Sequence, residues 1–89
     1  MIKYLTEFIG TFIFLSVILA TGQALPIGAA LAVAIWFGGS ISGGHFNPAV
    51  STMMLAKGKL SLTDYPWYVL AQILGGLAAL YFFQSAGGR

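Results

Sequence analysis

Three apolar blocks, each close to the length of a membrane span, constrain the fold of this chain more than any other feature. They cover about residues 4–21, 25–41 and 64–83. A helix needs roughly 20 mainly apolar residues to cross the hydrocarbon core of a bilayer, and these blocks are apolar all round rather than along one stripe. Only 7% of the 89 residues are charged. The sequence therefore predicts a single all-α integral membrane domain, residues 1–89, with three transmembrane helices.

The first block has a second interpretation, as the apolar part of a cleaved signal peptide. Lys3 precedes the apolar run Phe8–Ala20, and small residues follow, which is the order found in signal peptides. Glu7, however, lies where such peptides are normally basic, and two further blocks of spanning length follow. We therefore favour a first helix that stays in the membrane.

Few residues in this chain are suited to catalysis. It has no Cys, one His and two acids, Glu7 and Asp64. No nucleophile is paired with a base, the single His45 has no second metal ligand nearby, and four Lys and Arg residues are too sparse for a nucleic-acid surface. The sequence predicts no enzyme, no metal site, no cofactor and no nucleic-acid partner, and it predicts a lipid bilayer as the surroundings.

The segment between the second and third blocks combines a glycine-rich stretch with a short helix. The stretch Gly38–Gly44 is poorly suited to a helix because each Gly carries a penalty of about 1 kcal/mol. Asn47 is then a favoured N-cap, and Pro48 is a favoured first helical residue. A helix over Pro48–Lys57 measures roughly 15 Å, half of the hydrocarbon core. We expect a re-entrant loop and half-helix over residues 42–57, next to a cavity, since irregular backbone at this depth needs cover.

This loop and half-helix resemble the first repeat of the aquaporin and glycerol facilitator family, the major intrinsic proteins. The resemblance rests on the run Ser42-Gly43-Gly44-His45-Phe46-Asn47-Pro48-Ala49-Val50. Glu7-Phe8-x-Gly10-Thr11 is similar to the opening helix of the family, and Ala71-Gln72 with Gly75 to its third helix. A lone Asn-Pro-Ala tripeptide is weak evidence for the family, but nine consecutive matching residues after two blocks of spanning length are a specific signal. The resemblance implies half of an aquaporin-like inverted repeat.

The resemblance implies a passive channel for water and small neutral solutes such as glycerol. Asn47, Pro48 and Ala49 would form the central pore motif, at the positive end of the half-helix dipole. Carbonyl groups that line the solute path would come from three loop residues: Gly43, Gly44 and His45. The plainer alternatives are that Asn47-Pro48 is an ordinary helix start and that His45 only packs the loop.

The resemblance also implies two supporting residues and two positions at a constriction. Glu7 and Gln72 would hydrogen-bond the re-entrant loop, although Glu7 is near enough to the terminus to reach the interface. Ile27 lies where the family usually has an aromatic filter residue, and Val50 stands where the arginine of the second repeat would be. An aliphatic, uncharged constriction is expected to be less discriminating than a strict water pore, and proton exclusion is left open.

Two sets of residues are predicted to have structural roles. Aromatic residues at the start of the third block are expected to anchor it at the membrane interface: Tyr65, Trp67 and Tyr68. Small residues that recur every four positions are expected to allow close helix crossing: Ala30, Ala34 and Gly38, and Ala71, Gly75 and Ala79.

One half-repeat needs a complement, because a half-helix that ends at mid-membrane leaves polar backbone exposed. We expect an antiparallel homodimer or higher oligomer that recreates the inverted repeat, or a complementary half-channel chain. Lys3, Lys57 and Lys59 on one side against Arg89 on the other predict a cytoplasmic N-terminus, a bias weak enough to permit both orientations. The alternative function is a structural or accessory subunit, a truncated aquaporin-like fragment without autonomous transport.

Overall fold

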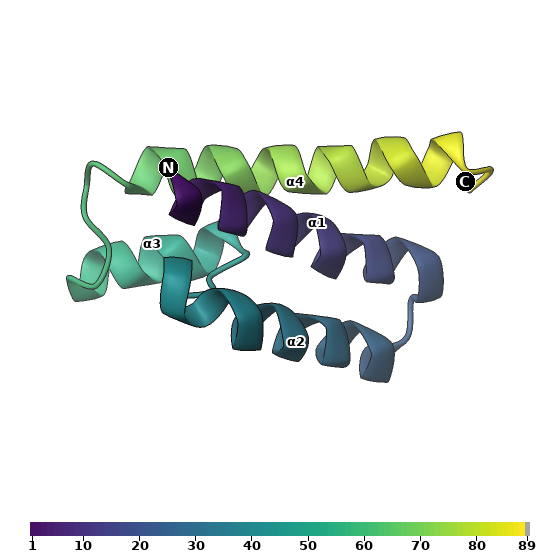
Figure 1. Ribbon diagram of the computed structural model, residues 1–89, viewed down its shortest axis with the longest axis horizontal. Helices are drawn as coiled ribbons and strands as arrows, with labels where there is room; N and C mark the ends of the chain where they lie inside the picture. Colours follow the sequence, from purple (N-terminus) through teal and green to yellow (C-terminus); the bar gives the residue numbers. More distant parts are fainter. Residues whose placement is uncertain (89) are drawn as a thin grey trace.

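The computed structural model describes residues 1–88, and this part of the chain is all helical (Figure 1). Its helices are α1 (Ile2–Thr21), α2 (Ala24–Ser42), α3 (Pro48–Lys57) and α4 (Tyr65–Ser85). Three of them, α1, α2 and α4, are long and apolar enough to cross a membrane. The predicted fold class is confirmed. Arg89, the base predicted to lie on the side opposite the three lysines, is outside the described residues.

The short helix α3 re-enters the molecule and returns to the end from which it came. The loop that follows α2 runs inward, and α3 then runs back toward the end where α2 finishes and α4 begins (Figure 1). Asn47 starts α3 as an N-cap whose side-chain oxygen accepts the Ala49 N–H at 2.8 Å. Gly58 ends it at φ 83°, a left-handed conformation that favours Gly. With ten residues, α3 spans half the hydrocarbon core.

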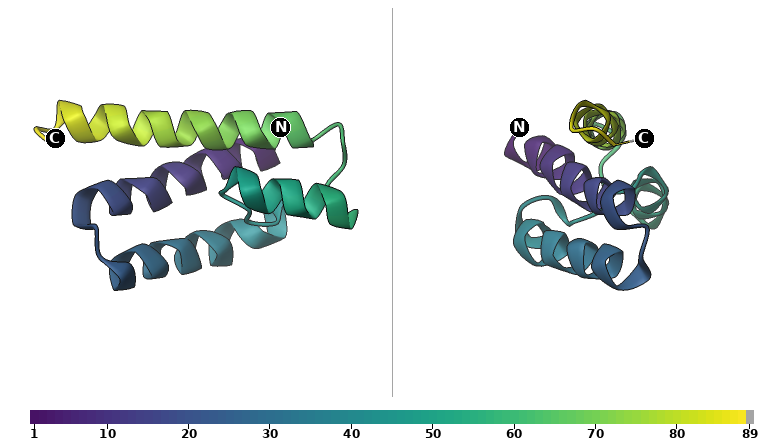
Figure 2. Two further views of the ribbon diagram at one scale, coloured as in Figure 1. Left: turned by 180° about the vertical axis from the view of Figure 1, so that it is seen from behind. Right: turned by 90° about the vertical axis from the view of Figure 1, so that its right-hand side faces the viewer.

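Helix α1 occupies the centre of the bundle. It packs against α4 on one side and α2 on the other, while α3 packs on α4 (Figure 2). The crossing of α1 and α4 depends on Gly75, because a Cβ atom there would lie 2.7 Å from the Phe8 carbonyl oxygen. The close crossing predicted from the small residues is therefore confirmed at this position.

One predicted interfacial anchor is wrong. Tyr68 is only 3% exposed, and its hydroxyl donates to the Ser42 carbonyl at 2.6 Å. The helical period explains this, since Tyr68 shares a face of α4 with Gln72 and Ala79, both of them buried against the bundle. Trp67, by contrast, is 53% exposed.

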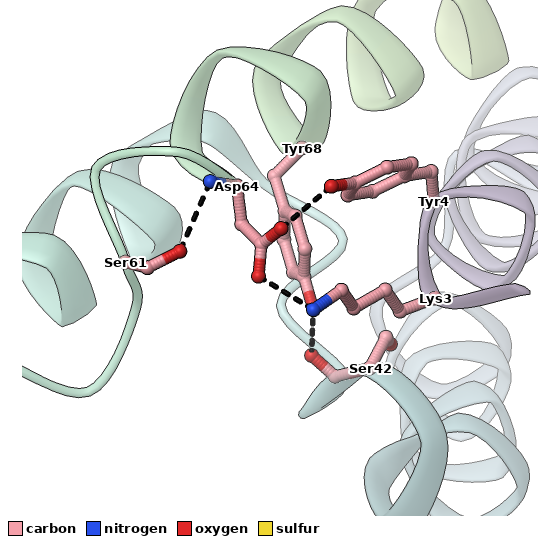
Figure 3. Close-up of polar contacts among 6 residues, drawn as sticks. All are labelled: Lys3, Tyr4, Ser42, Ser61, Asp64 and Tyr68. Carbon is pink, nitrogen blue, oxygen red and sulfur yellow. Dashed lines mark hydrogen bonds and ion pairs between the residues drawn. The ribbon is translucent and has the colours of Figure 1, made fainter. Parts of the chain in front are cut away.

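A polar cluster ties the N-terminal end of α1 to the start of α4 (Figure 3). The Asp64 carboxylate accepts hydrogen bonds from the Lys3 ammonium and the Tyr4 hydroxyl, each at 2.6 Å. These two bonds lower the pKa of Asp64 below its ordinary value. The Ser61 hydroxyl caps the turn by accepting the Asp64 N–H at 3.0 Å. Hydrogen bonds to Asp64 thus link the connection between α3 and α4 to the first turn of α1.

Candidate pore site

The re-entrant loop is held by the carboxylate of Glu7, which is fully buried in α1. One carboxylate oxygen accepts the Ser42 hydroxyl at 2.7 Å and the His45 N–H at 3.1 Å. The other accepts the Phe46 N–H at 2.7 Å and the Gln72 side-chain amide at 2.8 Å. Four donors from three parts of the chain therefore converge on one side chain. This arrangement satisfies loop backbone that would otherwise be unpaired at membrane depth.

A second set of contacts fastens α3 to the loop and to α4. The Ser51 hydroxyl, fully buried on α3, accepts the Gln72 amide at 2.8 Å and lies 2.9 Å from Nδ1 of His45. The His45 ring is also packed against Tyr68, with ring centroids 5.2 Å apart. Because its ring is engaged inside the chain, His45 offers no side chain to a solute path.

Phe46 forms an apolar wedge between α1 and α2. It is 2% exposed and has a φ of 55°, an uncommon conformation for a residue other than Gly. A Cβ atom at Gly10 would overlap its ring, and one at Gly38 would lie 2.9 Å from it. The missing side chains at Gly10 and Gly38 therefore make the room that the ring fills.

The residues of the predicted pore motif lie on the surface of this chain. Asn47, Pro48 and Ala49 are exposed at the start of α3. The loop residue Gly43 is exposed as well, whereas Gly44 is buried. Since the side-chain oxygen of Asn47 is used by its own helix, the amide nitrogen remains as an outward donor.

The two constriction candidates are not brought together. Val50 is half-buried in the first turn of α3, and Ile27 is half-buried in the first turn of α2. Ile27 precedes the end of α2 at Ser42 by roughly 22 Å along the helix axis. Any narrowing at Ile27 therefore lies toward the opposite end of the bundle from the loop.

A cavity of about 330 Å³ opens at the N-terminal end of α3, and we call it the helix-end cavity. Its apolar walls come from α1 and α4: Phe14, Leu15, Ile73, Gly76 and Leu77. Asn47 and Pro48 border it on the α3 side. Two buried polar atoms of its lining residues, the Thr11 hydroxyl and the side-chain oxygen of Gln72, have no hydrogen-bond partner among residues 1–88.

Several residues of the site are not predicted from the sequence. Ser51 joins the buried network, but an isolated serine gives no signal in an apolar sequence, and Ser42 is marked only as the first residue of the nine-residue run. Tyr68 had a usable signal, since it lies four residues before Gln72 and therefore on the same helical face. Thr11 is marked in the sequence only as part of the motif of the first helix, and nothing in the sequence indicates that its hydroxyl has no partner among residues 1–88.

The fold and site together define a class, an integral membrane protein with a re-entrant half-helix held by a buried acid. The model of one family, described as Major intrinsic protein, matches residues 1–87. The chain belongs to this family, which confirms the resemblance drawn from the motif.

Relatives with curated descriptions match over much of this chain but extend well beyond it. A "Glycerol uptake facilitator protein-like 6" from Lactiplantibacillus plantarum is 48% identical over 97% of this chain and 45% of its own length. "Aquaporin-9" from Homo sapiens is 40% identical over 80% of this chain and 29% of its own length. "Aquaporin Z" from Photorhabdus laumondii is 33% identical over 98% of this chain and 45% of its own length. The chain thus spans less than half the length of these relatives. No solved structure matches it.

Proposed function

We propose that this chain is the subunit of a passive membrane channel for water and small neutral solutes such as glycerol. The carrying observation is the half-helix α3, which begins inside the bundle with Asn47 exposed at its N-terminus. Membership of the Major intrinsic protein family and relatives named as aquaporins and a glycerol uptake facilitator support the same class. In this proposal two inverted half-repeats enclose the pore, the second being another copy in an antiparallel dimer.

The start of α3 has the chemistry that such a pore requires. The helix dipole is equivalent to about half a positive charge at its N-terminus, which repels cations. The free amide nitrogen of Asn47 donates to the oxygen of a passing water or hydroxyl group. Glu7 and Gln72 hold the loop that presents this donor, and the carbonyls of Gly43, Gly44 and His45 would supply acceptors along the same path.

The proposed selectivity follows from an aliphatic constriction. In the antiparallel arrangement this constriction would combine Ile27 of one copy with Val50 of the other, and these side chains offer no charge and no hydrogen-bond donor to a solute. A pore narrowed by such residues discriminates by size more than by hydrogen bonding, so it admits small neutral polyols beside water. The three lysines at the end of the bundle that holds the N-terminus favour a cytoplasmic location for that end under the positive-inside rule, and this bias is weak enough to allow a second copy in the opposite orientation.

Osmotic shrinkage of liposomes that contain only this chain tests the proposal. Stopped-flow light scattering is compared for the wild type, Asn47→Asp and empty liposomes. Asn47→Asp keeps the capping oxygen but replaces the outward donor by a negative charge, so we expect the excess water flux to be lost. Gln84→Glu makes the same amide-to-acid change at an exposed position near the end of α4 and should leave the flux unchanged.

Two results would contradict the channel proposal. Flux that is equal in the wild type and in Asn47→Asp would show that the motif is not in the path. Shrinkage no faster than in empty liposomes, with insertion verified, would show that the chain alone does not conduct. A stable hetero-complex found by co-purification would then favour the accessory-subunit alternative.

A further inference from the structure

We propose that an apolar groove between α1 and α2 binds one acyl chain of a membrane phospholipid, and that this chain supports the re-entrant loop. We call it the α1–α2 groove, and its volume is about 400 Å³. The ring of Phe46 is part of its lining, and exposed apolar side chains of both helices form its walls: Ile9, Ile13, Val33, Phe37 and Ile41. The proposal goes beyond the channel function, since it holds whether or not the chain conducts.

The chemistry of the α1–α2 groove fits a hydrocarbon occupant. Thr6 brings a hydroxyl to the lining, but this hydroxyl already donates to the Ile2 carbonyl at 2.8 Å. Because α1 and α2 are long and apolar enough to cross a membrane, the groove opens at the depth of the hydrocarbon core. A lipid tail covers such a surface without leaving a polar group unpaired.

The dimensions of the groove fit a lipid tail and are too small for a whole helix. The lining extends from Thr6 to Ile13 on α1 and from Val33 to Ile41 on α2, roughly 10–12 Å along the helix axes. The mean cross-section is then roughly 35–40 Å². A helix with its side chains is roughly 10–12 Å across and needs roughly 80–110 Å². Hydrocarbon carbons pack about 4 Å apart, so a single tail fits.

The groove lies within one leaflet and has a cation near its outer end. Thr6 is about 6 Å and Ile13 about 17 Å from the start of α1, a range that corresponds to roughly one leaflet of a 30 Å core. Lys3 precedes Thr6 by one helical turn and shares a face of α1 with Gly10. Its ammonium group has three N–H donors, and one of them bonds Asp64. The others can bond the phosphate of a lipid whose tail lies in the groove.

A tail in the groove acts on the re-entrant loop through Phe46. Gly10 and Gly38 have no side chains to cover the ring, and a Cβ atom at Gly38 would lie 2.9 Å from it. The same ring also lines the helix-end cavity, together with Asn47. The φ of Phe46 is 55°, and such a conformation persists only where the surroundings hold it. A tail packed on the ring therefore stabilises the loop that leads to Asn47.

Photolabelling of the chain in liposomes tests the site. The bilayer contains phosphatidylcholine with a diazirine in its acyl chain, and the labelled residues are identified by mass spectrometry after irradiation. We expect the yield at Ile13 and Val33 to be several-fold above the yield at Leu70 and Leu74, which are exposed on α4 outside the lining of both cavities. Equal yields at the four positions would show ordinary contact with bulk lipid and overturn the proposal.

A variant with a filled groove provides the matched test. Val33→Trp places a large side chain at the exposed wall of the groove, and Leu70→Trp makes a similar change on α4. We expect the label at Ile13 to fall several-fold in the first variant and to stay unchanged in the second. Efficient cross-linking of two Val33→Cys chains by a short bismaleimide, in a sequence without native Cys, would show a second copy in the groove and overturn the lipid as its occupant.

Hydrogen exchange of the loop tests the coupling through Phe46. Phospholipid is added to the detergent-solubilised chain, and exchange is followed at the Phe46 amide, which donates to Glu7. We expect added phospholipid to slow this exchange several-fold in the wild type and in Leu70→Trp, but not in Val33→Trp. Exchange in the wild type that phospholipid leaves unchanged would overturn the support of the loop by the tail.

Discussion

Replacement of Glu7 by Gln measures how strongly the buried carboxylate stabilises the re-entrant loop. Two of its four hydrogen bonds come from backbone N–H groups, those of His45 and Phe46. Gln has nearly the same shape, but one of its terminal oxygens becomes an NH₂ group that faces two donors. Whichever way the new amide is turned, the N–H of either His45 or Phe46 loses its acceptor.

The expected loss of stability follows from that count. One buried N–H left without an acceptor costs about 1–3 kcal/mol, and the remaining bonds lose the strength that a charged acceptor gives them. Removal of a charge from the membrane interior acts in the opposite direction. That gain is small here, because the donors around Glu7 already replace its hydration. We expect Glu7→Gln to lower the free energy of unfolding by about 2 kcal/mol.

Titration of the protein in mixed micelles with sodium dodecyl sulfate, followed by Trp fluorescence, gives this free energy. Gln84→Glu, an amide-to-acid exchange at an exposed position, serves as the control and should change stability by less than about 0.5 kcal/mol. A Glu7→Gln protein as stable as the wild type, or more stable, would refute the reasoning. It would show that desolvation of the carboxylate outweighs the hydrogen bonds it accepts.

Three further changes test the packing and the surface ion pair. Gly75→Ala is expected to lower the free energy of unfolding by about 1–3 kcal/mol, because the added Cβ meets backbone atoms of α1. Gly28→Ala, with open space around it, should raise the free energy of unfolding by about 0.5–1 kcal/mol. Equal effects of the two changes would contradict the close crossing of α1 and α4. Gly10→Ala should be far less damaging in a Phe46→Ala background than in the wild type, and additive losses in the double-mutant cycle would show that the two sites are independent. The pKa of Asp64 is lowered in the folded protein, so its contribution to stability is present above its ordinary value near 3.8 and is lost as the pH falls through the lower folded value. Unfolding titrations of Asp64→Asn should lack this part of the acid dependence, and an unchanged acid dependence would show that the ion pair contributes nothing.

The helices and the re-entrant loop were predictable because each depends on local sequence. A run of apolar residues near 20 in length has few stable alternatives to a spanning helix. The start of α3 is equally local, since Asn47 and Pro48 both favour a first helical turn. Recognition of the nine-residue motif then indicated which helices the loop should meet.

The polar contacts between distant residues were less predictable. The ion pair of Lys3 with Asp64 joins residues 61 positions apart, and only the packing of α1 on α4 brings them together. The position of Tyr68 at the start of α4 predicts an interfacial side chain, whereas the helical face that it shares with Gln72 buries it. Whether the Thr11 hydroxyl and the Gln72 oxygen find partners within residues 1–88 depends on where every neighbouring polar group lies, which is a property of the assembled bundle.

The Glu7 network also sets an order of events during synthesis of the chain. Glu7 leaves the ribosome before its donors, which follow 35 to 65 residues later. At 5–20 residues per second, translation needs roughly 3 to 13 s to supply the last of them. During that interval α1 carries an acid with none of its final partners, so it must remain near water or the insertion machinery. Helix α1 thus reaches its final surroundings only after Gln72 has arrived on α4.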